Sequence, residues 1–280
     1  FLMGPRVNAG GRVGESYLGA TLLSTLNAQE AMSIAQKLNK YNDERRNIED
    51  LVLEEALALA EVQAEMKSSQ SLVFVSGQDW HSGVIGIVAS RLKERYGLPA
   101  CVLSIKDGVA TGSGRSITGV DLGACIISAR QAGILLKGGG HAMAAGFSLE
   151  ADKLALFEEF LSDRVGRKIL EEAIVPTLDI DGLLTVDGAS MDLVEVLHKM
   201  APFGIGNAEP RLAFSSVRIA KADVVGSNHV RCFVTGVDSK KQISAIAFRC
   251  VDSNLGQSLL NHNGIPLHIV GRLRENNWQG

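Results

Sequence analysis

The sequence lacks the features that define several large classes of protein. It has only four cysteines, Cys101, Cys125, Cys232 and Cys250, with no CxxC pair among them, so neither a disulfide framework nor a cysteine zinc site is indicated. We expect buried free thiols in a reducing cytoplasm. No apolar run approaches the roughly 18 residues that cross a bilayer, so the sequence predicts no transmembrane helix and no membrane partner.

Motifs for metals and for nucleophilic catalysis are also missing. The sequence contains no GxSxG, HExxH or Walker loop. No cluster of Asp and His supplies two or more metal ligands at close spacing, although a phosphodiesterase normally needs such ligands to activate water. The residues present therefore predict no metal site. The chain begins at Phe1 and enters directly into the motif "GPRVNAGGR", so we expect a fragment of a longer protein.

The charge is small overall but unevenly distributed. The formal net charge of −3 argues against a surface that is basic throughout. Between Glu150 and Glu195 there are 12 acidic and 4 basic residues, whereas between Ile205 and Arg249 there are 7 basic and 3 acidic. This asymmetry allows a local basic face in the C-terminal part, although a solvated surface has the same composition.

Secondary-structure patterns divide the chain into four parts. Residues 1–26 combine a glycine- and arginine-rich turn with a short apolar helix. Residues 27–69 predict one long helix of about 60 Å, capped by Asn27, that connects two lobes. Residues 70–170 alternate strand and helix signals, as an α/β domain does. Residues 174–280 contain short alternating strands, typical of an oligonucleotide-binding (OB-like) barrel, which the end at Gly280 leaves one strand short.

Two glycine-rich segments carry arginines suited to phosphate. In "GSGRS" the glycines would let backbone amides turn toward an anion, while an arginine fork matches phosphate oxygens. A hairpin turn with an exposed arginine is the alternative. In "GPRVNAGGR" fixed donors again flank bare backbone, and a turn before a helix is the alternative. The candidate residues are Ser113, Arg115 and Ser116 in the first segment and Arg6, Asn8 and Arg12 in the second.

Two histidines stand in similar surroundings. His81 precedes a predicted helix with glycines in its first turns, where it either binds an anion or satisfies the helix start. His141 follows the run Gly138–Gly140 at the start of a predicted strand, where it either meets a phosphate or belongs to the core. The occurrence of several such glycine-rich segments in one chain favours a phosphodiester substrate.

Five ordered motifs, "GPRVNAGGR", "WHSGVIGIVASRL", "GSGRS", "DLGA" and "GGGHAMAAGFS", closely resemble the RecJ single-stranded-DNA-specific exonucleases of the DHH phosphoesterase superfamily. The resemblance covers almost the whole chain. It implies the end of a DHH domain at 1–26, a linker helix, a DHHA1 domain and an OB-like domain. It also implies two Mn²⁺ or Mg²⁺ ions, whose ligands we expect upstream of Phe1.

The resemblance implies a 5′→3′ exonuclease that serves DNA repair and recombination. Arg6, Asn8, Arg12 and His81 would contact the substrate, and Ser113 and Ser116 would hold phosphate beside Arg115. His141 with the amides of Gly139 and Gly140 would meet the phosphate near the metals, and Arg115 and His141 would balance the charge that develops there. The implied partners are single-stranded DNA and a single-strand-binding protein or helicase, with the chain a monomer.

Two other functions fit the same residues. The chain alone would serve equally as a non-hydrolytic module that binds single-stranded nucleic acid. A phosphodiesterase of the same superfamily could instead act on short oligonucleotides or cyclic dinucleotides. The strands after residue 174 favour long substrates, because small-substrate members of the superfamily generally lack this barrel.

Overall fold

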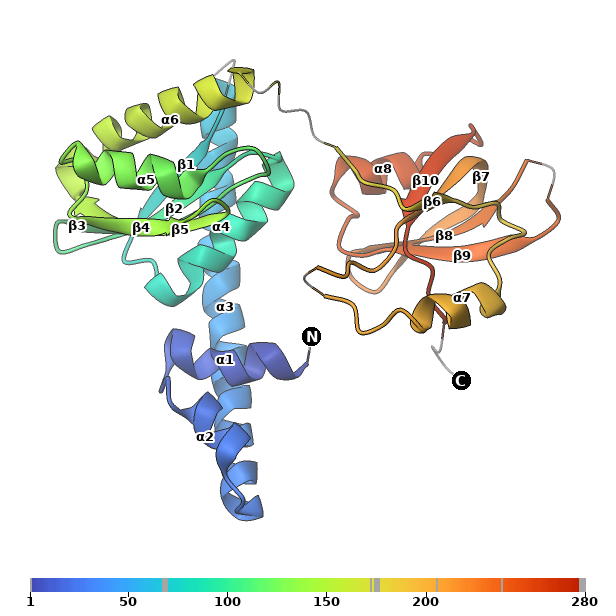
Figure 1. Ribbon diagram of the computed structural model, residues 1–280, viewed down its shortest axis with the longest axis horizontal. Coiled ribbons are helices and arrows are strands. Elements are labelled where there is room, and N and C mark those ends of the chain that lie inside the picture. The colour runs from blue at the N-terminus through green and yellow to red at the C-terminus, as the bar shows by residue number, and fades with distance from the viewer. Residues whose placement is uncertain are drawn as a thin grey trace. The chain divides into compact units, whose positions relative to one another are not determined.

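The computed structural model describes residues 2–66, 70–171, 173, 177–204, 206–237 and 239–276. The chain forms two compact units, Phe1–Pro176 and Thr177–Gly280 (Figure 1). The first is a mixed α/β unit and the second an OB-like β unit, so the expected fold class is confirmed. Within the described ranges no helix is long and apolar enough to span a membrane.

The first unit begins with three helices, α1 (Met3–Val13), α2 (Leu18–Ser24) and α3 (Ala28–Met66). The turn expected in "GPRVNAGG" is wrong, because this segment is helical throughout. Its glycines allow close packing: a Cβ on Gly10 would lie 2.4 Å from the carbonyl oxygen of Glu15 and 3.2 Å from Leu38. Packing on α3 thus offsets the conformational cost of glycine inside a helix.

The long helix α3 is confirmed, with 39 residues. Asn27 caps it, since its Oδ1 accepts from the amides of Gln29 and Glu30 at 2.9 and 3.2 Å. One stripe of α3 is buried along its length, with an apolar group at each end and a polar centre. Its members are Ile34, Leu38, Asn42, Arg45, Glu49, Val52, Ala56 and Ala60. The helix therefore packs as well as connects.

A five-stranded sheet forms the rest of the first unit, in the order β1-β2-β3-β5-β4. Its strands are β1 (Val73–Gln78), β2 (Ala100–Lys106), β3 (Val109–Arg115), β4 (Lys137–His141) and β5 (Ala144–Glu150). Only β1 and β2 are parallel; the other pairs are antiparallel.

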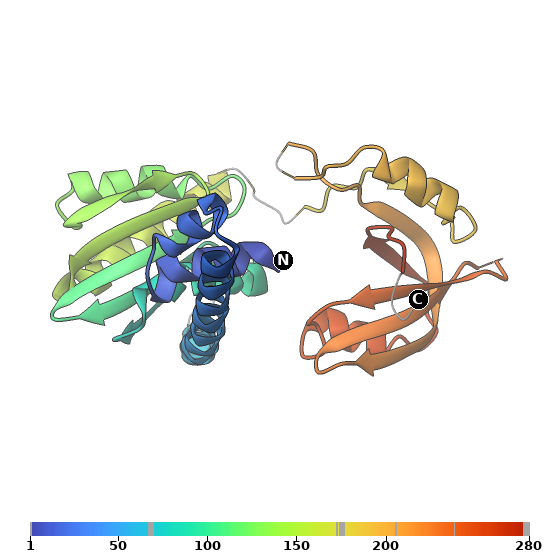
Figure 2. The ribbon, with the colours of Figure 1, turned by 90° about the horizontal axis from the view of Figure 1, so that it is seen from below.

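Helices cover the two faces of this sheet unequally. α4 (Ser82–Tyr96) packs with α3 over β1 and β2. On the opposite face lie α5 (Leu122–Gln131) and α6 (Leu154–Glu171) (Figures 1 and 2), with the 3₁₀ turn η1 (Ala151–Lys153) leading into α6. They cover a core around Phe157, whose ring contacts those of Phe74 and Phe147 edge to face. The α4 side of β5 and β4 remains largely exposed.

Two expectations about the glycine motifs are wrong. "GSGR" is the end of β3, paired on both sides, so its amides bond within the sheet and form no anion-binding turn. The run Gly138–Gly140 forms β4, and His141 ends that strand instead of starting one. Pairing with β5 holds this glycine run extended, and the Cβ space of Gly138 is filled by Ile126 and Leu135.

The second unit is built on one long strand. β7 (Leu212–Val225) pairs with β6 (Gly182–Leu183) and β10 (Leu267–Gly271) near its start and with β8 (His229–Thr235) near its end. β9 (Gln242–Ala247) adds to β8. Two helices, α7 (Met191–His198) and α8 (Asn254–Leu260), complete this unit within the described residues. The strands enclose a core around Phe214, Val230 and Val234.

Candidate nucleic-acid interface

One wall of the candidate site forms where α1 ends against α4. The guanidinium of Arg12 donates to the carbonyl oxygen of Gly83 at 3.1 Å. A Cβ on Gly83 would lie 2.1 Å from the carbonyl oxygen of Arg12. Only glycine therefore allows this approach of α1 to α4. Asn8 lies one turn before Arg12 on the same exposed face of α1.

His81 stands at the adjacent helix start. Its Nδ1 accepts from the amide of Gly83 at 3.0 Å, so the histidine is the N-cap of α4. Because Nδ1 is an acceptor here, the neutral ring carries its proton on Nε2, which can donate to a ligand. The imidazole is exposed. The helix-start interpretation of His81 is thus correct, and it leaves one donor available.

A residue that the sequence analysis missed positions this loop. Trp80 is 6% exposed, and its indole nitrogen donates to the carboxylate of Glu55 on α3 at 2.7 Å. The indole covers Gly77, where a Cβ would lie 2.1 Å from the ring. The sequence signal was the pair of Gly77 and Trp80 at either end of a short loop.

Arg115 forms the second wall. Its guanidinium donates to the hydroxyl of Ser113 at 3.0 Å and to the carbonyl of Gly114 at 2.8 Å. It lies against Gly86 of α4, where a Cβ would come within 2.9 Å of Nη2. Gly86 thus makes room for the arginine, as Gly83 does for α1.

The two walls bring two positive charges together. Burial, and then the nearby guanidinium of Arg12, lower the pKa of Arg115. Among the described residues, neither Arg12 nor Arg115 makes an ion pair with a carboxylate. Arg115 is half-buried and Arg12 is exposed. Two like charges close together without a counter-charge raise the free energy of the site without a ligand, and a bound anion relieves this cost.

His141 shares one row of the sheet with Arg115. Arg115 pairs with Ala144, and Ala144 pairs with His141. Paired residues on neighbouring strands point to the same face and strands lie about 4.8 Å apart, so Ala144 alone separates the arginine from the histidine. The small Ala144 leaves the space between them open.

The "DLGA" motif fixes the turn that carries His141. Asp121 caps α5 through the amide of Ala124 at 2.9 Å. The amide of Leu122 donates to the carbonyl of Ala142 at 3.1 Å. Gly123 lies so close to the backbone of His141 that a Cβ would come within 3.0 Å. This motif therefore positions the histidine from behind the sheet.

Not all the predicted residues join this site. Arg6 donates to Asn39 of α3 at 2.8 Å and to the carbonyl of Leu2, on a different face of α1 from Arg12. Ser116 is fully buried and its hydroxyl donates to the carbonyl of Val120 at 2.8 Å, so it closes a turn and does not face the site. Gly139 and Gly140 lie on the edge strand β4, where alternate backbone amides face away from the sheet.

The described residues do not fit a metal ion. Among them, no group of three or more His, Cys, Asp or Glu side chains lies close enough to hold one. The four cysteines are free thiols; three are buried as expected, whereas Cys125 is half-buried. Burial raises the pKa of Cys101 to about 12. No chemical step through a metal can be assigned to these side chains.

The second unit presents a separate surface on the outer face of β7, β8 and β9. Arg231 lies 5.4 Å from the ring centre of Phe233, and His229 contacts Phe248 edge to face at 5.3 Å. Phe248 is 67% exposed. Of the other aromatic residues of this unit, Phe214 is buried, Phe203 is half-buried and Trp278 lies outside the described residues.

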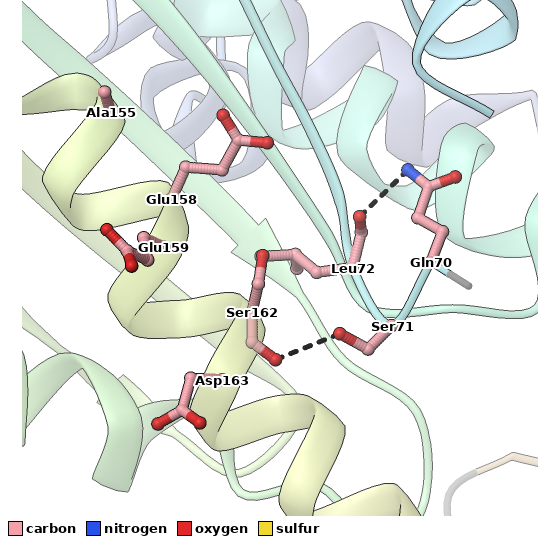
Figure 3. Close-up of a pocket in the computed structure, with 8 residues that line it drawn as sticks. All are labelled: Gln70, Ser71, Leu72, Ala155, Glu158, Glu159, Ser162 and Asp163. Carbon is pink, nitrogen blue, oxygen red and sulfur yellow. Dashed lines mark hydrogen bonds between the residues drawn. The ribbon is translucent and has the colours of Figure 1, made fainter. Parts of the chain in front are cut away.

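A hollow elsewhere in the first unit has the wrong charge for nucleic acid. It has a volume of about 450 Å³ and lies between α6 and the segment that enters β1 (Figure 3). Its lining includes the carboxylates of Glu158, Glu159 and Asp163. Carboxylates repel phosphate, so this hollow is not part of the candidate site.

Family models match two parts of the chain. A DHHA1 domain model matches residues 69–167, and a RecJ OB domain model matches residues 180–280. These ranges contain β1 to α6 and β6 to β10, respectively.

Curated relatives match the whole chain. The single-stranded-DNA-specific exonuclease RecJ of Escherichia coli K12 is 32% identical over 285 residues, which cover 100% of this chain and 48% of the relative. The RecJ of Bacillus subtilis 168 is 29% identical over 283 residues, 99% of this chain and 34% of the relative. The chain thus spans half or less of the length of these relatives.

A solved structure agrees. The crystal structure of RecJ in complex with Mn²⁺ from Thermus thermophilus superposes with a TM-score of 0.77 at 25% identity, over 100% of this chain and 39% of that chain.

Proposed function

Because the chain belongs to the RecJ family and corresponds to its C-terminal portion, we propose that it is the substrate-binding half of a single-stranded-DNA-specific exonuclease. The observation that carries this proposal is the pair of guanidiniums of Arg12 and Arg115, which lie against Gly83 and Gly86, three residues apart on α4. Neither has a carboxylate partner among the described residues. The substrate is a single DNA strand, degraded 5′→3′ during repair and recombination, as the resemblance of the motifs implies.

In this proposal the described residues bind and orient a phosphate. The forks of Arg12 and Arg115 donate to the phosphate oxygens from two sides, and Nε2 of His81 donates from the start of α4. His141 approaches from the far side of Ala144. Fixed donors of this kind also stabilise charge that develops on phosphate oxygens during hydrolysis.

The metal ligands come from outside this chain in our proposal. The RecJ structure from Thermus thermophilus contains Mn²⁺, whereas the described residues here offer no suitable cluster. The Mn²⁺ or Mg²⁺ ions would then be held by a part of the full-length protein that this chain does not include.

We expect the 280-residue chain to bind single-stranded DNA without degrading it. Twelve-nucleotide oligothymidylate (dT12) should bind with an affinity that falls as salt rises, because phosphate contacts release counterions. The same sample with Mn²⁺ should release no nucleotides above the metal-free background. Fluorescence anisotropy and acid-soluble nucleotide release measure the two results. Clear Mn²⁺-dependent release would contradict the external location of the ligands, and absent binding would contradict the proposal itself.

The outer face of the second unit should contribute base stacking. Since stacking on an aromatic ring is worth about 1–3 kcal/mol per base, Phe248→Ala should lower the affinity for dT12 by about 5- to 100-fold. The loss should be much smaller for an abasic strand of equal length, which keeps the phosphates. Leu255→Ala is the matched control, because Leu255 is an apolar residue of the same unit with similar exposure. Equal losses on both strands would argue against stacking.

A further inference from the structure

The row of Arg115 and His141 is the first of three rows that cross β3, β5 and β4 in register. The first row is Arg115, Ala144 and His141; the second is Ser113, Gly146 and Gly139; the third is Thr111, Ser148 and Lys137. Since every second residue of a strand faces the same side, all nine positions lie on one face. Successive rows are about 7 Å apart and the three rows span about 14 Å.

This face is the one that no described helix covers at β5 and β4. Phe147 and Leu149, which alternate with these positions on β5, are buried in the core on the side of α5 and α6. On the other side α4 packs on β1, β2 and β3, and Gly86 meets Arg115 of β3. Gly146 and Lys137 are exposed.

Two of the three residues in the middle row, Gly139 and Gly146, have no side chain. A Cβ placed on Gly139 or on Gly146 would meet no heavy atom within 4 Å. Neither glycine has a positive φ, so neither packing nor backbone conformation requires glycine at these two strand positions. Glycine inside a strand is unfavourable and often marks a place where a ligand approaches closely. The open space above these two residues is therefore the feature that needs an occupant.

The third row supplies hydrogen-bond donors next to the open space above Gly139 and Gly146. Thr111 and Ser148 carry hydroxyls, and Lys137 carries an exposed ammonium group with no ion pair among the described residues. The next row on the same face contains Glu150, which pairs with Val109 and bonds to Lys153. A carboxylate repels a phosphodiester backbone, so the favourable surface ends after three rows.

We propose that these three rows form a backbone track: a single strand of nucleic acid lies across β3, β5 and β4, with one phosphate at Arg115 and a later one at Lys137. Because Gly139 and Gly146 have no side chains, the sugar-phosphate backbone can lie directly on the sheet. This inference rests on the proposed function for the phosphate at Arg115. It adds a second phosphate at Lys137, and the two positions together define the path of the strand across the sheet.

The salt dependence of dT12 binding tests the second phosphate. Each phosphate contact on single-stranded DNA contributes about 0.7 to the slope of log affinity against log salt concentration. Lys137→Gln should lower that slope by about 0.7 and the affinity by about 3- to 10-fold. Lys106→Gln is the matched control, because Lys106 is an exposed lysine in the Glu150 row, beyond the track. It should change neither quantity.

A second variant tests the open space above Gly139 and Gly146 without removing a charge. Gly146→Val places a branched side chain in the open space, and valine favours the strand conformation, so the unit should fold with unchanged stability in urea titration. The variant should bind dT12 at least about tenfold more weakly, because the backbone can no longer lie on the sheet.

The outcomes separate the track from the proposed function. If Arg115→Ala weakens binding while Lys137→Gln and Gly146→Val bind like the unmodified chain, the track is overturned and the phosphate site stands. If Lys106→Gln changes the slope as much as Lys137→Gln, general charge attraction explains both and the track is overturned. If the unmodified chain fails to bind dT12, both proposals fall.

Discussion

Replacing Arg115 with alanine is expected to lower the affinity for dT12 by roughly 10- to 100-fold. The loss follows from the removal of a charge-assisted bond to phosphate, worth about 1.5–3 kcal/mol. Arg115→Lys should recover only part of the affinity, because an ammonium keeps the charge but loses the planar fork. Anisotropy titrations at several salt concentrations measure both variants, and the salt slope should fall by about 0.7 in Arg115→Ala only.

The fold should survive this substitution. Among the described residues, Arg115 donates only to Ser113 and Gly114 of its own strand, and its removal relieves the repulsion with Arg12. Arg130→Ala is the control, since Arg130 also donates to a strand carbonyl of this sheet, that of Gly138, but from α5 on the opposite side. An affinity unchanged by Arg115→Ala, or reduced equally by Arg130→Ala, would contradict a phosphate at Arg115.

Arg12 and Arg115 should also prove coupled. If both hold one phosphate, the double variant should lose less affinity than the sum of the two single losses, because the second removal acts on a site already broken. Strict additivity would place the two arginines at separate phosphates.

Local signals in the sequence were sufficient to predict most elements of the fold. Asn27, the predicted cap of the long helix, does begin α3, because its side chain accepts from the amides of Gln29 and Glu30. This prediction succeeded because caps depend on residues close in sequence. The helix α1 was missed for the complementary reason: Gly10 is tolerated in it through packing on Glu15 and Leu38, which no local pattern reveals.

The candidate site was predictable only residue by residue. The resemblance named Arg12, Arg115 and His141, but their proximity depends on strand register and on the packing of α1 against α4. Ser116 illustrates the limit, because it follows Arg115 directly and yet points into the protein. Successive residues of a strand point to opposite faces, so the motif alone could not show that Arg115 faces the site while Ser116 is buried.

The packing of α1 against α4 leads to the second large expected effect, that of Gly83→Ala. The added Cβ would lie 2.1 Å from a backbone oxygen of Arg12, and no side-chain rotation can relieve that clash. Either α1 or the first turn of α4 must shift, at a cost of about 1–3 kcal/mol in the unfolding free energy of the first unit. The shift should also separate Arg12 from Arg115, so the affinity for dT12 should fall to about that of Arg12→Ala.

Gly4→Ala and a double variant show whether Gly83→Ala weakens DNA binding by moving Arg12 or by destabilising the first unit. Gly4 lies in α1 with nothing within 4 Å of its Cβ position, so alanine there should be neutral or stabilise the helix by up to about 1 kcal/mol and leave DNA binding unchanged. In the Gly83→Ala background, Arg12→Ala should cost no further affinity, because Arg12 has already left the site. A large additional loss in that double variant would mean that Arg12 binds DNA without its contact to α4. The close approach of α1 to α4 at Gly83 would then contribute to stability but not to DNA binding.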